Sequence, residues 1–130
     1  MPSLYFIELT VRDLDAAITW YREVMGARQL MRVDADAFAL LSTGGTRLSL
    51  RQGTPLPGGV LLAFEVTDLD EWIHSMAERG VRLEGEVKTS HEGYRRARVR
   101  DADGYAVSVF EWINRERGGT DALTSIPPRE

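Results

Sequence analysis

Two stretches of the chain share a pattern in which a strand-like alternation of apolar and polar residues runs into a helix-like one. In the first, Ile7, Leu9 and Val11 recur at every second position, which predicts a strand with one buried face. Apolar residues then recur at helical spacing from Asp13, which suits a helix N-cap, to Gly26, which can end a helix in the left-handed conformation. We therefore expect a strand followed by a helix.

The second stretch repeats the first. Residues 6–15 and 61–70 both end in Val-x-Asp-Leu-Asp after a strand-like run, and a helix-like segment that reaches Gly80 follows the second copy. A later pair of segments also matches, because Gly45-Thr-Arg-Leu-Ser49 resembles Gly104-Tyr-Ala-Val-Ser108. The first pair is offset by 55 residues (13 to 68) and the second by 59 (45 to 104). Matches in the same order at nearly the same offset predict two copies of one structural unit.

Each predicted helix is followed by three further strand candidates, and a Pro/Gly-rich linker at residues 55–59 separates the two halves. The strand candidates are residues 27–33, 38–42 and 47–51 in the first half and 81–88, 94–100 and 106–112 in the second. The pattern predicts an α+β protein of two tandem βαβββ modules, residues 4–53 and 59–113. We expect one domain over residues 1–113 and a C-terminal tail over 114–130.

Composition narrows the classes of function. A chain of 130 residues is the size of one ordinary domain, and its formal net charge of −4 is unlike the basic footprint of a nucleic-acid-binding protein. The absence of cysteine excludes disulfides and thiolate metal sites. No apolar run approaches the roughly 20 residues of a membrane span, and the N-terminus lacks a signal-peptide pattern. We expect a cytoplasmic protein that binds neither nucleic acid nor membranes.

The predicted order βαβββ-βαβββ resembles that of the vicinal-oxygen-chelate superfamily. So does the Val-x-Asp-Leu-Asp signature, which leads directly into the helix that ends at Gly26. Asp101-Ala-Asp103-Gly104-Tyr105 is similar to the Asp-Pro-Asp-Gly-Asn turn of these proteins. The superfamily includes glyoxalase I, extradiol dioxygenases, fosfomycin resistance enzymes and bleomycin-binding resistance proteins. The resemblance covers roughly residues 4–112 and implies a glyoxalase/bleomycin-resistance-like fold, in which the modules form a mixed-sheet cavity. It leaves the reaction open.

The resemblance also implies where a metal would bind. Metal-dependent members place a His or Gln seven residues before the Asp of the signature, and a Glu four residues after the turn glycine. In this chain those four positions hold Phe6, Leu61, Ser49 and Ser108. Divalent metals require several converging carboxylate or imidazole ligands, which these side chains do not supply. We therefore expect no metal at the usual site and no cofactor.

The resemblance further implies that the strand faces turned away from the helices line the cavity. Apolar walls with a few charged groups suit a small-molecule site, in which arginines would hold an anion and Trp112 an aromatic ring. The same arginines would also fit a solvated sheet edge or the rim of a dimer. The predicted ligand-binding residues are Phe6, Glu8, Thr10, Arg47, Ser49, Arg51, Leu61, Arg96, Arg98, Ser108, Phe110 and Trp112.

Two residues are candidates for acid–base catalysis. Glu8 is placed to act as a general base, although pairing with Arg47, Arg51 or Arg96 would make it structural. His91 lies in a polar loop beside Glu92 and could transfer a proton, although an exposed loop histidine needs no such role. Trp20 and Trp72 lie at core spacing on the predicted helices and are interpreted as packing residues.

Three functions fit these features. The leading hypothesis is a metal-independent small-molecule-binding protein of the glyoxalase/bleomycin-resistance type, which sequesters an aromatic or anionic ligand and forms a homodimer because its sheets are open. The alternative is a lyase, isomerase or dioxygenase with an atypical metal site or with Glu8/His91 chemistry. The third is a partner-binding module whose cavity is filled. An enzyme needs a converging acid–base pair, whereas a binding protein does not. We expect the tail to dock on the body or on a second subunit.

Overall fold

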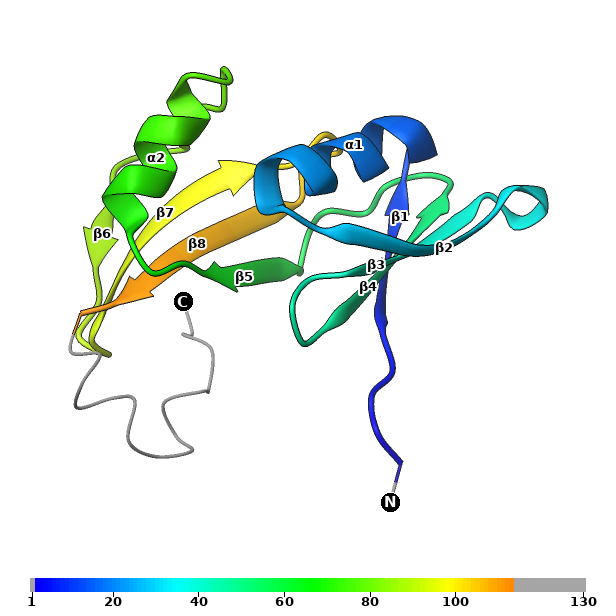
Figure 1. Cartoon of the computed structure of the whole chain (residues 1–130), viewed down its shortest axis with the longest axis horizontal. Helices are drawn as coiled ribbons and strands as arrows, with labels where there is room; N and C mark the ends of the chain where they lie inside the picture. Colours follow the sequence, from blue (N-terminus) through cyan, green and yellow to red (C-terminus); the bar gives the residue numbers. More distant parts are fainter. Residues whose placement is uncertain (1, 114–130) are drawn as a thin grey trace. The chain divides into compact units, whose positions relative to one another are not determined.

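The computed structural model describes residues 2–113, which form two compact units, each with a four-stranded sheet and one α-helix (Figure 1). Among the described residues, the first unit comprises 2–59 together with 101–105, and the second comprises 60–100 together with 106–113. The two sheets confirm the predicted α+β fold of tandem modules. None of the described helices is long and apolar enough to span a membrane. The predicted docking of the tail, 114–130, lies outside the described residues.

The first unit follows the predicted βαβββ order, with a short 3-10 turn (Asp34–Asp36) before its third strand. Its sheet has the strand order β1-β4-β3-β2, in which β1 and β4 are parallel and the other neighbours antiparallel. The elements are β1 (Ile7–Val11), α1 (Leu14–Met25), β2 (Arg28–Val33), β3 (Phe38–Ser42) and β4 (Arg47–Gln52).

The ends of α1 are those expected from the sequence. The Asp13 side chain accepts a hydrogen bond from the backbone N–H of Ala16 (3.1 Å), and Gly26 ends the helix with a φ of 73°. The apolar stripe of the helix is buried, and Leu9 and Val11 of β1 are buried with it. The alternation in β1 therefore turns its apolar side chains toward the helix, as predicted, although Ile7 at the start of the strand stays partly exposed.

The second unit repeats this topology. It contains β5 (Leu61–Glu65), α2 (Leu69–Ala77), β6 (Lys88–Thr89), β7 (Tyr94–Arg100) and β8 (Ala106–Trp112) in the sheet order β5-β8-β7-β6. As in the first unit, the first and last strands are parallel and the others antiparallel. Asp68 caps α2 by accepting a hydrogen bond from the N–H of Glu71 (3.0 Å).

Two predictions for the second half are wrong. The expected strand 81–88 is reduced to the two residues of β6, because Gly85 adopts a φ of 80° that interrupts an extended chain. Glu84 instead donates its N–H to the carbonyl of Arg98 (2.6 Å) from a loop. The helix ends at Ala77 rather than running to Gly80, which forms a left-handed turn three residues later.

The turn Asp101–Tyr105, which connects β7 to β8, belongs to the first unit. The Tyr21 hydroxyl on α1 donates to Oδ2 of Asp101 (2.5 Å), and both residues are buried. Oδ1 of Asp101 accepts from the backbone N–H groups of Asp103 and Tyr105, each at 2.9 Å. Burial raises the pKa of the Tyr21 phenol above its ordinary value, and the charge and hydrogen bond of Asp101 raise it further.

Tyr105 anchors the same turn to β1. Its hydroxyl donates to the carbonyl of Thr10 (2.7 Å) and accepts from the N–H of Leu56 (3.1 Å). Residues far apart in the sequence therefore fix the backbone of β1, the strand that carries Glu8.

Replacing Tyr21 by Phe tests the importance of the Tyr21–Asp101 bond. We expect the free energy of unfolding at pH 7 to fall by about 1–3 kcal/mol, because the substitution leaves a buried carboxylate oxygen without its donor. Urea denaturation followed by circular dichroism measures the change, and Tyr5→Phe, on an exposed tyrosine, is the control that should change little.

The pH dependence of this bond has a definite sign. A raised pKa in the folded state stabilises the protein below the ordinary tyrosine pKa of 10.0, and this stabilisation is lost as the pH rises above that value. Between pH 9 and roughly 11 the wild type should therefore lose more stability than Tyr21→Phe does. Parallel losses in the two proteins would contradict a protonated Tyr21 hydrogen-bonded in the core.

Candidate functional site

The face of the first sheet turned away from α1 carries most of the polar residues predicted for the first module. Glu8 of β1 is opposite Ser49 of β4, and Thr10 is opposite Arg51. The intervening Leu9 and Leu50 are buried with the helix, so the alternation places Glu8, Ser49 and Arg51 on the other side. We call this side, with residues 5–6 that precede β1, the open face of the first sheet.

Glu8 is held by two donors from β4. The Ser49 hydroxyl donates to Oε1 of Glu8 (2.7 Å), and Nε of Arg51 donates to Oε2 (3.2 Å). Ser49 is fully buried, whereas 33% of the Glu8 side chain is exposed. The carboxylate is thus an anchored hydrogen-bond acceptor that still reaches the surface.

Three aromatic rings and two arginines lie on the same open face as this carboxylate. The ring centroids of Tyr5 and Phe6 lie 5.9 Å apart, and those of Phe6 and Phe38 lie 6.3 Å apart. Because β4 lies between β1 and β3 in the sheet, the Phe6 and Phe38 rings meet over β4. The Arg47 guanidinium lies 4.2 Å from the Tyr5 centroid, and that of Arg51 lies 4.9 Å from the Phe38 centroid. We call the three rings the aromatic strip; an arginine stacks on each end.

Tyr5 and Phe38 were missed by sequence reasoning. Strict alternation assigns Tyr5 to the face opposite Phe6, but residue 5 precedes β1 and is free of that constraint. Phe38 is opposite Arg51 in the β3–β4 hairpin. Pairing the strand candidates 38–42 and 47–51 as a hairpin would have identified it.

The predicted residues of the second module also share a sheet face. Ala63, Ser108 and Arg98 occupy one row across β5, β8 and β7. The next row toward the β8 C-terminus contains Glu65, Phe110 and Arg96 in the same strand order. Each of these residues alternates with a side chain on the α2 side of the sheet.

The aromatic residues of this second face pack mainly on one another. The rings of Tyr94, Phe110 and Trp112 have centroid separations of 5.5 to 6.0 Å in edge-to-face geometry. Tyr94 and Phe110 are buried, and Trp112 is half-buried. Ser108 and Arg96 are buried, whereas Leu61 is partly exposed. The described part of this face therefore exposes less aromatic surface than the aromatic strip does.

The side chains at the expected metal-ligand positions do not fit a divalent metal. Phe6 and Leu61 have no donor atom, and the Ser49 hydroxyl is used by Glu8. Ser108 adds only a neutral hydroxyl. Within residues 2–113, no group of three or more His, Asp or Glu residues is arranged to hold a metal ion.

The two catalytic candidates differ in their surroundings. Glu8 is anchored by Ser49 and Arg51, while His91 is an exposed residue in the turn between β6 and β7. Among the described residues, His91 makes no hydrogen bond or ion pair. The described part of neither unit therefore supplies a hydrogen-bonded acid–base pair built on Glu8 or on His91.

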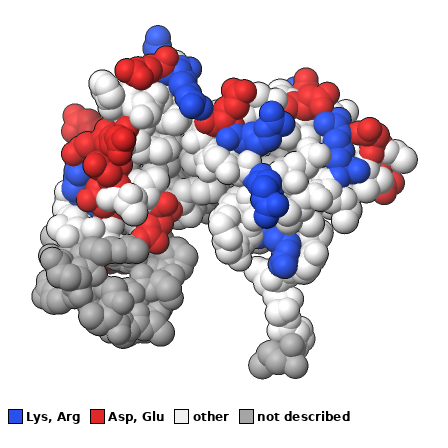
Figure 2. Space-filling model, in the orientation of Figure 1, with Lys and Arg blue, Asp and Glu red and all other residues white. Residues whose placement is uncertain are grey.

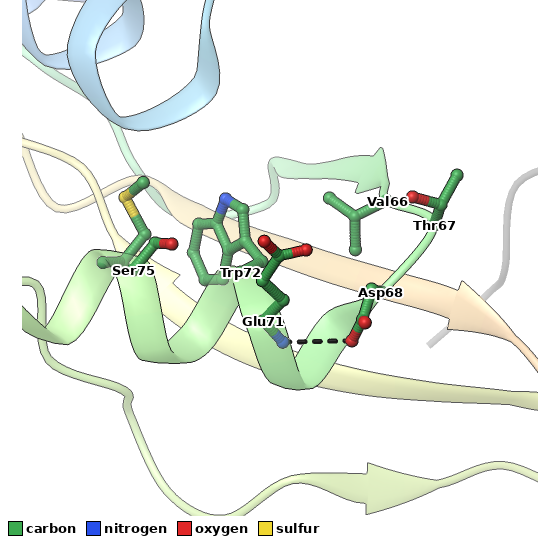
Figure 3. A pocket seen from close by; sticks show the side chains of 7 residues that line it. Val66, Thr67, Asp68, Glu71, Trp72 and Ser75 are labelled. Carbon is green, nitrogen blue, oxygen red and sulfur yellow. Dashed lines mark hydrogen bonds between the residues drawn. The ribbon is translucent and has the colours of Figure 1, made fainter.

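A separate pocket of about 280 Å³ lies beside the start of α2 in the second unit (Figure 3). Its wall includes the Trp72 ring and the carboxylates of Asp68 and Glu71, and Asp68 is engaged as the helix cap. Trp72 thus lines a surface pocket, although it was interpreted from the sequence as a packing residue. Its volume lies at the lower end of the usual range of about 300–1,000 Å³, and because Asp68 is already engaged as the helix cap, this pocket is not our candidate site.

Charged side chains are unevenly distributed on the face of the molecule drawn in Figure 2. Acidic side chains gather over the unit that contains α2, whereas both basic and acidic side chains lie over the unit that contains β1–β4. It is the guanidiniums of Arg47 and Arg51, and not the charge of the whole unit, that favour an anionic ligand.

Comparisons with known proteins agree on the fold. The model of the Glyoxalase/Bleomycin resistance protein/Dioxygenase superfamily matches residues 3–109. Among solved structures, TioX from Micromonospora sp. ML1 is 28% identical with a TM-score of 0.66, covering 84% of this chain and 95% of that one. A glyoxylase/bleomycin resistance protein/dioxygenase domain from Frankia sp. EAN1pec is 26% identical with a TM-score of 0.69, covering 86% and 98%.

A third solved structure also resembles this chain, at lower sequence identity. The fosfomycin resistance protein FosX from Listeria monocytogenes is 18% identical with a TM-score of 0.75, covering 90% of this chain and 97% of that one. At this identity the likeness concerns the fold alone. No curated protein matches the sequence.

Ser49→Ala tests whether Glu8 is anchored as described. We expect the free energy of unfolding to fall by about 0.5–1.5 kcal/mol, the usual net contribution of one hydrogen bond. The matched control is Ser108→Ala in the second module, because Ser108 is also buried but its hydroxyl has no hydrogen-bond partner among the described residues. Equal losses in the two variants would show that the Ser49–Glu8 bond adds no stability.

Proposed function

Because the chain belongs to the Glyoxalase/Bleomycin resistance protein/Dioxygenase superfamily, we propose that it is a small-molecule-binding member that needs no metal. The observation that carries the proposal is the replacement of the usual ligand set. Phe6 and Ser49 occupy two metal-ligand positions, and they contribute to the aromatic strip and to the anchor of Glu8. The positions that would hold a metal instead build an organic binding surface.

The open face of the first sheet suits an aromatic or anionic ligand. Tyr5 is well exposed, and Phe6 and Phe38 are half-buried, so the strip offers ring surface for stacking. Arg47 and Arg51 stand at its ends and can donate several hydrogen bonds to a carboxylate, sulfonate or phosphate. These residues lie mainly on strands, which position side chains more rigidly than loops do.

The alternative of a lyase, isomerase or dioxygenase has less support. Such chemistry requires either a metal held by converging ligands or an acid–base pair close to the substrate. Glu8 is held by a buried hydroxyl and a guanidinium, which suits a fixed acceptor better than a group that must exchange a proton. A binding role uses these contacts without further groups.

The proposal predicts metal-independent binding of an aromatic anion. We expect 2-naphthoate to bind with a Kd of about 1 mM or tighter, corresponding to roughly −4 kcal/mol. The protein's aromatic ¹H–¹³C resonances should shift at Tyr5, Phe6 and Phe38. The affinity should be the same after EDTA treatment and after addition of Mn²⁺ or Zn²⁺.

A pair of arginine variants locates the site. Arg47→Gln should weaken naphthoate binding about fivefold or more, because it removes a charge-assisted hydrogen bond. Arg22→Gln removes the same charge from α1 and should leave the Kd unchanged. Binding that depends on added metal, or that persists unchanged in Arg47→Gln, would contradict a metal-free site on this face.

We also propose that the protein forms a homodimer. β1 and β5 are edge strands of their sheets, and unpaired edges are available for association. Large apolar side chains on or next to these edges are exposed, with Leu4 at 80%, Ile7 at 44% and Leu61 at 37%. Burying these side chains against a second copy would remove apolar surface from water and so stabilise a dimer.

Light scattering coupled to gel filtration tests the dimer. We expect twice the 14.6 kDa mass of one chain for the wild type. Ile7→Lys should shift the protein toward the monomer, whereas Leu30→Lys, on the other edge strand β2, should not. A wild-type monomer at micromolar concentration would rule the dimer out.

A further inference from the structure

Arg47 and Arg51 differ in how many of their donors the protein uses. Nη1 of Arg47 donates to the carbonyl of Tyr5 (3.2 Å), and Arg47 makes no ion pair among the described residues. A guanidinium has five N–H donors, so most of those on Arg47 remain available to an anion. Arg51 donates to Glu8 and to the carbonyl of Asp36 (3.2 Å), so it uses two donors, one of them in an ion pair, and has fewer left for a ligand than Arg47.

Glu8 offers hydrogen-bond acceptors and a negative charge, whereas Arg47 offers donors and a positive charge. Each of its oxygens accepts one hydrogen bond from the protein, and a carboxylate offers about four lone-pair sites. Because a third of the side chain is exposed, the remaining sites can accept a donor from a bound molecule. The open face thus presents an anion-binding guanidinium and a donor-binding carboxylate.

The strand register places these two residues on the same face of neighbouring strands. Glu8 is opposite Ser49, and Arg47 lies two residues before Ser49 on β4. Diagonal neighbours on adjacent strands lie about 7–8 Å apart, and the Arg47 guanidinium lies over the ring of Tyr5, which precedes β1, so the two charged groups are set apart along the strip. The aromatic strip borders this interval and offers ring surface for stacking.

We infer that the open face selects aromatic molecules that carry an anionic group at one end and a hydrogen-bond donor at the other. The inference rests on the small-molecule binding proposed above and specifies the class of ligand. Arg47 binds the anion, Glu8 accepts the donor, and the rings of Tyr5, Phe6 and Phe38 contact the flat centre.

Four related probes test this arrangement on the full-length wild-type protein. 4-Aminobenzoate has a carboxylate and an amine at opposite ends of one ring, 2-aminobenzoate has them side by side, and benzoate and aniline each lack one group. Titrations followed by the aromatic resonances of the strip should give 4-aminobenzoate an affinity about fivefold higher than benzoate, the effect of one added hydrogen bond. 2-Aminobenzoate should bind no more tightly than benzoate, because its amine does not reach Glu8.

Variants assign each end of the ligand. Glu8→Ala should abolish the preference for 4-aminobenzoate over benzoate, and a far-ultraviolet circular dichroism spectrum like that of the wild type shows that the variant is folded. Arg47→Gln should weaken both carboxylates by a similar factor and leave aniline unaffected.

The possible failures are distinguishable. Equal affinities of the wild type for benzoate and 4-aminobenzoate would overturn the inference and leave the proposed binding of aromatic anions standing. A preference for 4-aminobenzoate that survives in Glu8→Ala would also overturn it. If neither naphthoate nor any of the four probes perturbs the strip, the proposed function itself fails.

Discussion

The parallel pairing of β1 with β4 is the constraint on which the candidate site depends. In the observed register Glu8 is opposite Ser49, and Leu9 is opposite Leu50. A slip of one residue would turn Glu8 toward α1 and expose Leu9, because side chains alternate along a strand. Burial of the leucines therefore fixes the register, and the register brings the carboxylate to its two donors. The apolar core on one side of the sheet thus orders the polar chemistry on the other.

The same strand is fixed from a distant part of the chain. Tyr105 binds the carbonyl of Thr10, two residues beyond Glu8, and the adjoining Asp101 is bonded to Tyr21 in the core. Both bonds are buried or partly buried and leave little freedom to the backbone of β1. A ligand site gains affinity when its groups are ordered before binding, since less entropy is lost on association. The turn Asp101–Tyr105 therefore stabilises the fold and also orders the strand that carries Glu8.

The chain shares its fold with a superfamily, but at two of the usual metal-ligand positions it has Phe6 and Ser49. Where a metal-dependent member would place ligands, Phe6 instead stacks toward Phe38 and Ser49 anchors Glu8. Neither substitution disturbs the alternation of the strands, so the fold tolerates the change while the site acquires different properties. Fold and function are separable here because the repeated strand–helix pattern, and not the side chains at these two positions, specifies the fold.

Local patterns in the sequence were enough to predict the repeated βαβββ order and the caps Asp13, Gly26 and Asp68. Period and capping are properties of neighbouring residues, which explains this success. Contacts between distant segments were not predictable in the same way. The Ser49–Glu8 bond joins residues 41 apart, and Tyr5 joins the aromatic strip from outside the strand alternation. These features follow from strand pairing and packing, which no local pattern encodes.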